Sequence, residues 1–438
     1  MPLLLSFAGI VCLVLLITWC RLDTFISFVV VSVAIGLASG LDIHRITDAI
    51  QKGIGSIMGS LVIILGFGAM LGKLIADSGA AQQITESLVR ISGIRRIQWA
   101  MALSGFLVGI PMFYSAGFMV LLPLIFSVAA VTGLPLLYLG IPMLAALSVA
   151  HGFLPPHPSP TAIAGQLHAG IGKTLFYGLI VAVPTIILAG IVFGRTMRKY
   201  KPATPPTLLT MKFLEPGELP SLGISLAMAL LPLILLTATT VFRFIPVVPP
   251  LQKVIAFIGD PNIAMLLSVL AALYWLGIKR HRPVREVMRS LEDAFKGVAP
   301  FMLIIAGAGA FMQVMSEGGL NQYIAKSLEH SSIPPLVLGW SIAALIRICT
   351  GSSTVAALTT VGTLLPVLQQ SSVEPELMVL AVGAGSMTFS HVNDGGFWLF
   401  KEYFNLTIRQ TFATWTVMET MVSVVGLLMV LLLNQIVH

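Results

Sequence analysis

Charged residues are scarce in this chain. Only 10% of its 438 residues are Asp, Glu, Lys or Arg, whereas about a quarter is usual for a soluble globular protein. The hydrophobic fraction is 57% and the mean hydropathy is +0.96. Apolar runs of roughly 20 residues, the length that crosses a bilayer, recur along the whole chain. These features exclude a soluble domain with a single anchor, and they predict an all-α polytopic membrane protein.

Cysteine is also rare, and the chain lacks the features of a cleaved leader. The three cysteines, Cys12, Cys20 and Cys349, lie in or beside apolar runs. We expect them to be small buried hydrophobic residues, not a disulfide framework or a zinc site. No basic segment precedes the first apolar run, 3–20, and the residues after it make a poor cleavage site. We therefore expect this run to remain as a membrane helix.

The net charge of +7 indicates orientation in a membrane and does not predict binding to nucleic acid. The two densest basic loops, 195–201 and 279–285, are separated by two predicted spans, so both can face the cytoplasm. Counting outward from these loops places both termini on the opposite, periplasmic side. Membrane lipid is the expected surrounding, and a homodimer is a possible assembly.

Hydropathy predicts ten spans, two of them broken, and two re-entrant helical hairpins. The expected spans are 3–20, 24–40, 57–76, 135–168 (broken), 174–194, 221–244, 261–278, 298–316, 375–404 (broken) and 411–436. The expected hairpins are 97–131 and 334–370, whose small and polar residues lie at their tips. For each hairpin, two ordinary spans joined by a short loop are the alternative.

The two halves of the sequence repeat at a spacing of 240 residues. Ile84, Ser87 and Leu88 match Ile324, Ser327 and Leu328. The charge count gives opposite directions to spans 57–76 and 298–316, so the repeat is predicted to be inverted. The expected organisation is N-terminal helices with an amphipathic connector (1–56), a first repeat (57–200), a cytoplasmic linker (201–220), connecting helices with a basic amphipathic segment (221–297) and a second repeat (298–438).

Two predicted spans break in the middle, one near His151 and one at Ser390–Gly396. Hydrocarbon cannot satisfy the freed backbone groups, so each break must be packed in protein or line a wet cavity. Interrupted spans at matching places in two halves point to the substrate site of a secondary transporter. Histidine is a common metal ligand, and these segments contain His151, His157 and His391. No cysteine or clustered carboxylate accompanies them, so no metal site is predicted.

The tips of the hairpins supply polar groups suited to an anion. Gly351, Ser352, Ser353 and Thr354 begin a half-helix, whose free N–H groups attract negative charge. Arg347 stands just before them and needs a partner, which is either a substrate carboxylate or a permanent acid or carbonyl of the protein. The predicted substrate-binding residues are Tyr114, Ser115, His151, Arg347, Gly351, Ser352, Ser353, Thr354 and Asn393.

A carrier driven by protons needs a titrating group close to its substrate. Asp394 lies inside the second predicted break, three residues after His391. We predict that Asp394 binds the coupled proton, with His391 as its partner or as the carrier itself. The alternative is that Asp394 only caps the half-helix that begins at Gly395.

Four segments, 66–73, 151–158, 347–356 and 390–405, resemble the gluconate permease (gluconate:proton symporter) family, and the resemblance spans nearly the whole chain. It implies an inner-membrane carrier that imports gluconate or a related sugar acid with protons by alternating access, with no other cofactor. The chain departs from the family at Ser115, where members commonly carry Glu, and at Ser353, where Ala is common.

Two alternatives to a sugar-acid carrier are kept. One is a carrier for another small hydroxy or amino acid anion, such as D-serine. The other is an anion channel, whose flux would not saturate. An intramembrane enzyme needs a nucleophile–base pair or a metal cluster that the sequence does not offer, so no enzymatic activity is predicted.

Overall fold

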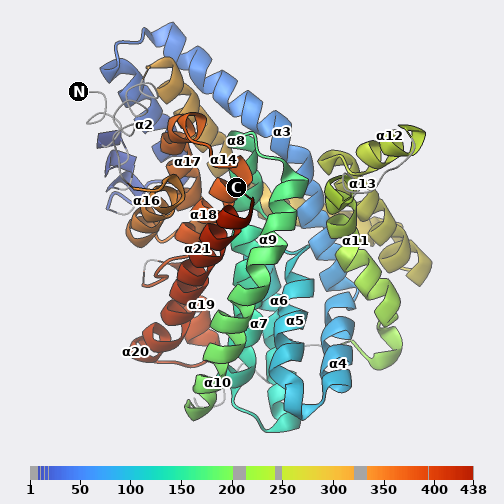
Figure 1. The fold of residues 1–438 in the computed structure, drawn as a ribbon. Helices are drawn as coiled ribbons and strands as arrows, with labels where there is room; N and C mark the ends of the chain where they lie inside the picture. The colour runs from blue at the N-terminus through green and yellow to red at the C-terminus, as the bar shows by residue number, and fades with distance from the viewer. Residues whose placement is uncertain are drawn as a thin grey trace.

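A computed structural model describes residues 8–9, 11–13, 15–17, 19–200, 214–241, 249–319, 333–392 and 394–437. Within these residues all regular structure is helical (Figure 1), which confirms the all-α fold. The first half contains α2 (Thr24–Ala38), α3 (Ile43–Asp77), α4 (Ala80–Ser92), η1 (Ile94–Arg96), α5 (Ile97–Gly109), α6 (Tyr114–Thr132), α7 (Leu136–Phe153), α8 (Pro158–Gln166), α9 (Ile171–Thr185), η2 (Ile186–Val192), α10 (Phe193–Thr196) and η3 (Met197–Lys199).

The second half begins after the segment 201–213. It contains η5 (Pro216–Glu218), α11 (Leu222–Val241), α12 (Pro249–Ile258), α13 (Pro261–Ala272), η7 (Leu273–Gly277), η8 (Ile278–Arg280), α14 (Val284–Glu317), α16 (Pro335–Thr350), α17 (Ser353–Gln370), α18 (Pro375–Ser386), α19 (Gly395–Tyr403), α20 (Ile408–Thr411), η9 (Phe412–Thr416) and α21 (Val417–Val437). Most of the linker 201–220, the repeat partners 324–328 and the residue His438 lie outside the described residues.

The order of elements in the first half recurs in the second half. A long helix (α3 or α14) is followed by a helix–turn–helix (α5–α6 or α16–α17) and a broken helix (α7–α8 or α18–α19). A helix with a π-helical stretch (η2 or η9) ends each set. Figure 1 shows α5–α6 in the lower half of the molecule and α16–α17 in the upper half. Hairpins that enter from opposite sides are expected of an inverted repeat.

Helices α3 and α14 pack against each other and are longer than expected. We predicted that the span of the first repeat begins at 57, and that span 298–316 of the second repeat follows a separate basic amphipathic segment, whose residues are 284–296. Instead, each long helix continues into the span without a break. The Asp42 carboxylate caps α3 by accepting from the His44 and Arg45 amides at 2.9 and 3.1 Å. Gly53 stays inside α3 because a Cβ there would lie 2.3 Å from the Gly309 carbonyl oxygen of α14, so close packing overrides its low helix propensity.

Several of the described helices are long and apolar enough to cross a membrane. They are Leu136–Gln166, Ile171–Lys199, Pro261–Arg280, Val284–Glu317 and Ile408–Val437. The pair Val62–Asp77 and Ala80–Ser92, bent by 61°, would make one more. The chain is therefore a multi-pass membrane protein. The count of ten spans and the periplasmic termini stay predictions.

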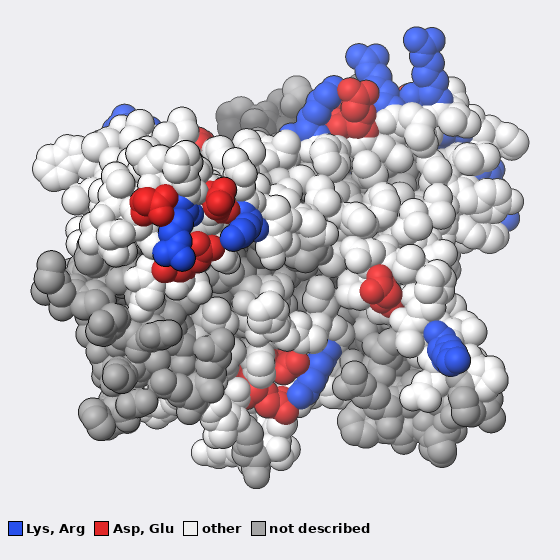
Figure 2. Space-filling view, turned by 90° about the horizontal axis from the view of Figure 1, so that it is seen from above, with Lys and Arg blue, Asp and Glu red and all other residues white. Residues whose placement is uncertain are grey.

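The described residues on the face seen from above are largely uncharged. Figure 2 shows Lys, Arg, Asp and Glu in small groups on the upper face, separated by wide uncharged areas. The prediction that the three cysteines are buried is wrong, because Cys12, Cys20 and Cys349 are exposed. A membrane protein presents apolar side chains to lipid, so an apolar helix context does not imply burial in protein.

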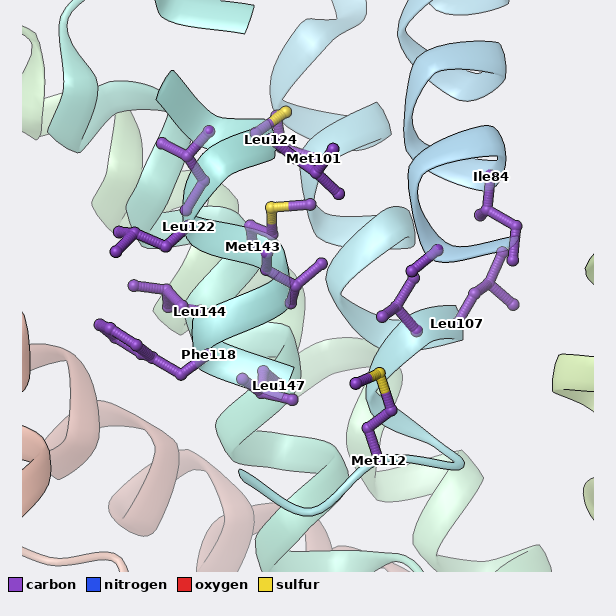
Figure 3. Close-up of a cluster of buried hydrophobic side chains, with 14 of the residues drawn as sticks. Ile84, Met101, Leu107, Met112, Phe118, Leu122, Leu124, Met143, Leu144 and Leu147 are labelled. Carbon is purple, nitrogen blue, oxygen red and sulfur yellow. The ribbon is translucent and has the colours of Figure 1, made fainter. Parts of the chain in front are cut away.

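A core of apolar side chains holds the first hairpin in place. Ile84 of α4, Met101 of α5, Phe118 of α6 and Leu147 of α7 are fully buried against one another (Figure 3). Because lipid tails are as apolar as these side chains, close van der Waals packing holds the helices together here. Met112, also buried, lies on the turn between α5 and α6 and joins the hairpin tip to this core.

The two broken helices cross each other just before their breaks. A Cβ at Gly383 of α18 would lie 2.3 Å from the carbonyl oxygen of Gly152 in α7. Only a residue without a side chain permits this approach. The predicted breaks are confirmed: α7 ends at Phe153 and α18 ends at Ser386, and each chain resumes as a helix at Pro158 and Gly395. The crossing brings the two breaks to one place.

Candidate substrate site between the hairpin tips

A cavity of about 860 Å³ lies where the hairpin tips and the helix breaks meet. One wall comes from both tips, both breaks and α21, and the other from α3 and α14. Residues that line it include Tyr114, His151, Arg347, Gly351, Ser352, Ser353, Thr354, Asp394 and Glu419. Its volume lies in the usual range for small-molecule sites, about 300–1,000 Å³. Seven of the nine predicted substrate-binding residues therefore line one cavity.

Arg347 is the buried cation of this cavity. Its side chain is 5% exposed, and its Nη2 lies 2.5 Å from Oδ2 of Asp394. Its Nη1 donates to the Gly351 carbonyl. Arg347 thus has an acid and a carbonyl of the protein as partners, which was the alternative left open by the sequence. The Nε–H is fully buried and has no partner among the described residues, so the hydrogen bonds of the guanidinium are not all satisfied by these two partners.

Asp394 is held by three partners. Its Oδ1 accepts from the Gly396 amide at 2.9 Å and so caps α19. Its Oδ2 accepts from Arg347 and from the Ser390 hydroxyl. The Trp415 indole N–H in turn donates to Ser390 at 2.7 Å. Asp394 therefore caps α19, which was the alternative to proton binding considered from the sequence. It also forms an ion pair with Arg347.

His391 lies apart from the other predicted residues. Its Nε2 is 3.0 Å from the Ile348 carbonyl oxygen, and its ring packs 5.6 Å from Phe389. It is not among the described side chains that line the cavity. The structure therefore does not place His391 beside a bound substrate.

The second hairpin tip begins a helix, as predicted. Gly351 ends α16 with φ +72, a left-handed conformation that suits glycine. The Ser352 hydroxyl accepts from the Val355 amide at 3.3 Å and caps α17. The cavity therefore faces the N-terminus of an 18-residue helix, whose free amides attract an anion.

The first tip contributes polar groups without partners. Tyr114 and His151 have ring centroids 5.5 Å apart, and neither the Tyr114 hydroxyl nor His151 Nδ1 has a partner among the described residues. His157 is buried and its Nε2 lies 2.9 Å from the Gly109 carbonyl oxygen, which ties the first break to the first tip. Buried polar atoms normally have hydrogen-bond partners, so a polar ligand is expected to complete this group. Asn393 and the side chain of Ser115 lie outside the described residues.

The arrangement of a buried ion pair, a helix N-terminus and unpartnered polar atoms suits a small polar anion. Within the described part of the chain, no group of three His, Cys, Asp or Glu side chains could hold a metal ion. The family model described as GntP family permease matches residues 1–436. The chain belongs to the GntP permease family. It is a transporter and not an enzyme.

Curated relatives agree with this family over their full length. The chain is 46% identical to a high-affinity gluconate transporter of Escherichia coli K12 and 45% identical to the Gnt-II system L-idonate transporter of the same strain. It is also 45% identical to the gluconate permease of Bacillus subtilis 168. Each match covers 100% of both chains.

Solved transporter structures share the fold of this permease at low sequence identity. The YdaH transporter of Alcanivorax borkumensis superimposes with a TM-score of 0.66 at 18% identity, covering 94% of this chain and 97% of the other. MtrF of Neisseria gonorrhoeae gives a TM-score of 0.67 at 13% identity and covers 94% of each chain. At such identity the likeness supports the fold alone.

Glu419 is a cavity residue that the sequence analysis missed. It lies on α21, is 1% exposed and accepts from the Ser148 hydroxyl at 2.5 Å. Its Oε2 has no partner among the described residues. The acid predicted from the sequence was Asp394, which lies at a break. An acid in the middle of the apolar segment Ile408–Val437 was the available signal, because ionisable residues inside spans are usually functional.

Proposed function

We propose that this permease imports gluconate or a closely related sugar acid by proton symport, with alternating access, across a bacterial inner membrane. The observation that carries the proposal is the shared cavity, lined by both hairpin tips, in which the buried Arg347 pairs with the partly buried Asp394. The substrate class is supported by the relatives, which are named as gluconate and L-idonate transporters. The membrane orientation with both termini in the periplasm rests on loop charge.

The cavity can divide the recognition of a sugar acid between two regions. The substrate carboxylate would bind at the N-terminus of α17 and the guanidinium of Arg347, where charge-assisted hydrogen bonds are strong. The substrate hydroxyls would bind Tyr114 and His151, whose polar atoms have no partner among the described residues. Alternating access is supported by the duplicated elements and by the two helix–turn–helix pairs, α5–α6 and α16–α17, which occupy opposite halves of the molecule (Figure 1).

Uptake into proteoliposomes tests this function. The purified permease is reconstituted, and uptake of labelled gluconate, L-idonate and D-serine is measured with an acidic exterior, without a pH gradient, and with a protonophore. We expect saturable accumulation of the sugar acids that requires the gradient and is abolished by the protonophore. Uptake that ignores the gradient would contradict proton symport, uptake of D-serine alone would contradict the substrate class, and flux that does not saturate would indicate a channel.

A further inference from the structure

We infer that Glu419 carries the coupled proton, and that this proton removes a negative charge that would otherwise repel the substrate anion. The inference rests on the proposed proton symport and names its residue. It differs from the prediction made from sequence, in which Asp394 and His391 were the candidates. Three observations carry it: the partners of Asp394, the position of Glu419 and the sum of charges in the cavity.

Asp394 is fully engaged in its ionised form. It accepts from Arg347, Ser390 and the Gly396 amide. Protonating it would break the ion pair and leave Arg347 buried with an uncompensated charge, which is strongly unfavourable. Asp394 is therefore the permanent counter-ion of Arg347. It is poorly suited to bind and release a proton in each transport cycle.

The surroundings of Glu419, unlike those of Asp394, favour the protonated form of the carboxyl group. Its side chain is buried, only Ser148 donates to it, and no Lys, Arg or His of the described chain forms a salt bridge with it. Its Oε2 has no partner among the described residues, and the residue lines the cavity. A buried carboxylate without a cation is costly, and binding a proton removes this cost. A proton can reach Glu419 through the cavity that also admits the substrate.

The neighbouring charges do not offer another carrier. The charged groups that act on Glu419 are Arg347 and Asp394. Other charged groups are paired with one another. Lys173 of α9 lies 3.7 Å from Glu376 of α18, and Lys73 of α3 lies 2.7 Å from Asp77. Asp293 of α14 lies 3.4 Å from Lys296. The other titratable groups nearby in the described chain include Tyr114, His151 and His157, whose ring centroid lies 5.4 Å from that of His151. A proton on His151 would add a second positive charge close to Arg347, which opposes it.

The sum of charges couples the proton to the anion. Arg347 and Asp394 cancel, so an ionised Glu419 adds one uncompensated negative charge to their end of the cavity, and protonation removes it. A sugar-acid carboxylate therefore binds better after Glu419 has taken up a proton. By linkage, the bound substrate increases the affinity for the proton by the same factor. In the step, one O–H bond forms at Glu419 from periplasmic hydronium, leaving water, and it breaks when the proton passes to cytoplasmic water. The expected stoichiometry is one proton per anion.

The variant Glu419→Gln tests the inference because glutamine resembles the protonated carboxyl. We expect this variant to keep gluconate exchange, measured with unlabelled and labelled gluconate on opposite sides of the liposome, within about threefold of the unmodified permease. Accumulation driven by an acidic exterior should be lost. The matched control is Glu402→Gln, because Glu402 is 68% exposed, pairs with Lys401 and lies outside the cavity; it should exchange and accumulate normally.

Proton uptake on binding gives a second readout. In weakly buffered detergent solution, gluconate binding should take up about one proton per substrate in the unmodified permease and none in Glu419→Gln. Gluconate affinity should rise by about 5- to 150-fold on acidification in the unmodified permease, the usual range for coupled sites, and stay nearly constant in the variant. A merely structural role of Glu419 would leave proton uptake per bound substrate unchanged.

Three results would overturn the inference. They are accumulation by Glu419→Gln, loss of exchange by this variant in liposomes where Glu402→Gln exchanges normally, and an uncoupled Asp394→Asn that exchanges but does not accumulate. The variant Ser148→Ala keeps the carboxyl but removes its donor. It should move the pH profile of uptake to higher pH, and an unchanged profile would also contradict the inference.

Uptake by the unmodified permease that does not respond to a pH gradient would contradict the proposed proton symport itself. This result is distinguishable from a failure of the inference about Glu419.

Discussion

At the scale of single residues, the cavity depends on how its one buried cation is shared. Arg347 uses two nitrogens on Asp394 and Gly351 and keeps its Nε–H without a partner among the described residues. A buried ion pair gives little net stability, but removing one partner is costly. Arg347 can therefore be structural and substrate-binding at once, and single substitutions cannot separate the two roles.

Arg347→Gln is expected to lower both stability and affinity. It leaves Asp394 without its cation, so the free energy of unfolding should fall by about 3–5 kcal/mol. Gluconate binding should weaken by about 10- to 100-fold through loss of a charge-assisted hydrogen bond. Thermal unfolding in detergent and titration with labelled gluconate measure the two effects.

The double variant Arg347→Gln with Asp394→Asn is the control for this prediction. It removes both charges, so most of the lost stability should return while binding remains weak. Binding equal to that of the unmodified permease in the double variant would show that Arg347 does not contact the substrate.

Tyr114→Phe should reduce affinity without reducing stability. The Tyr114 hydroxyl has no close hydrogen-bond partner among the described residues, and its interaction with the Ser148 hydroxyl, which donates to Glu419, is weak, so removing it should cost little stability. A lost hydrogen bond to substrate is worth about 0.5–1.5 kcal/mol, which is up to about tenfold in affinity. Tyr403→Phe is the matched control, because Tyr403 packs on the same Phe118 ring at 6.2 Å but does not line the cavity. Equal affinities of the two variants would contradict a contact between Tyr114 and substrate.

At the scale of elements, the broken helices α7 and α18 position the cavity by crossing at glycines. The Gly383 contact with Gly152 fixes where the two breaks meet. A second close approach, between Gly385 and the Trp340 carbonyl oxygen, holds α18 against α16, because a Cβ there would lie 2.3 Å from that oxygen. The N-terminal parts of the broken helices are therefore rigidly packed, while their breaks remain beside the cavity.

Gly383→Ala is expected to destabilise the permease by about 1–3 kcal/mol, the usual cost of overpacking. The added methyl group meets backbone, which cannot move aside as a flexible side chain can. Gly223→Ala in α11 is the matched control, because a Cβ there meets nothing within 4 Å, and alanine favours a helix. A thermal unfolding temperature of Gly383→Ala no lower than that of the control would contradict the crossing.

At the scale of the whole molecule, two sets of elements meet at one cavity, and the loop charges orient them. The hairpins α5–α6 and α16–α17 occupy opposite halves in Figure 1 and both reach the cavity. The orientation with both termini in the periplasm follows from loop charge alone. It therefore needs a test that does not depend on the fold.

Labelling of single cysteines tests this orientation. Cys12, Cys20 and Cys349 are exposed, so they must first be replaced by serine. A membrane-impermeant thiol reagent added to whole cells should then modify a cysteine placed at Pro2 or His438 and spare one placed at Arg198. The reverse pattern would place the termini in the cytoplasm and refute the charge count.

The sequence by itself determined the features that depend on neighbouring residues. Hydropathy located the helices, and polar or proline-rich interruptions located the breaks after Phe153 and Ser386. Capping residues such as Ser352 and Asp394 marked helix starts, because a cap is a contact over two or three residues. The family also followed from local motifs.

Only the tertiary structure decided which polar groups face each other. Arg347 meets Asp394 across 47 residues of sequence, and Ser148 meets Glu419 across 271. His391, although close to Asp394 in sequence, lies outside the cavity lining, and the basic segment 284–296 continues into α14. Such pairings depend on where the folded chain returns in space, whereas hydropathy and capping measure local free energies. A buried acid in an apolar span therefore becomes interpretable only once its neighbours are known.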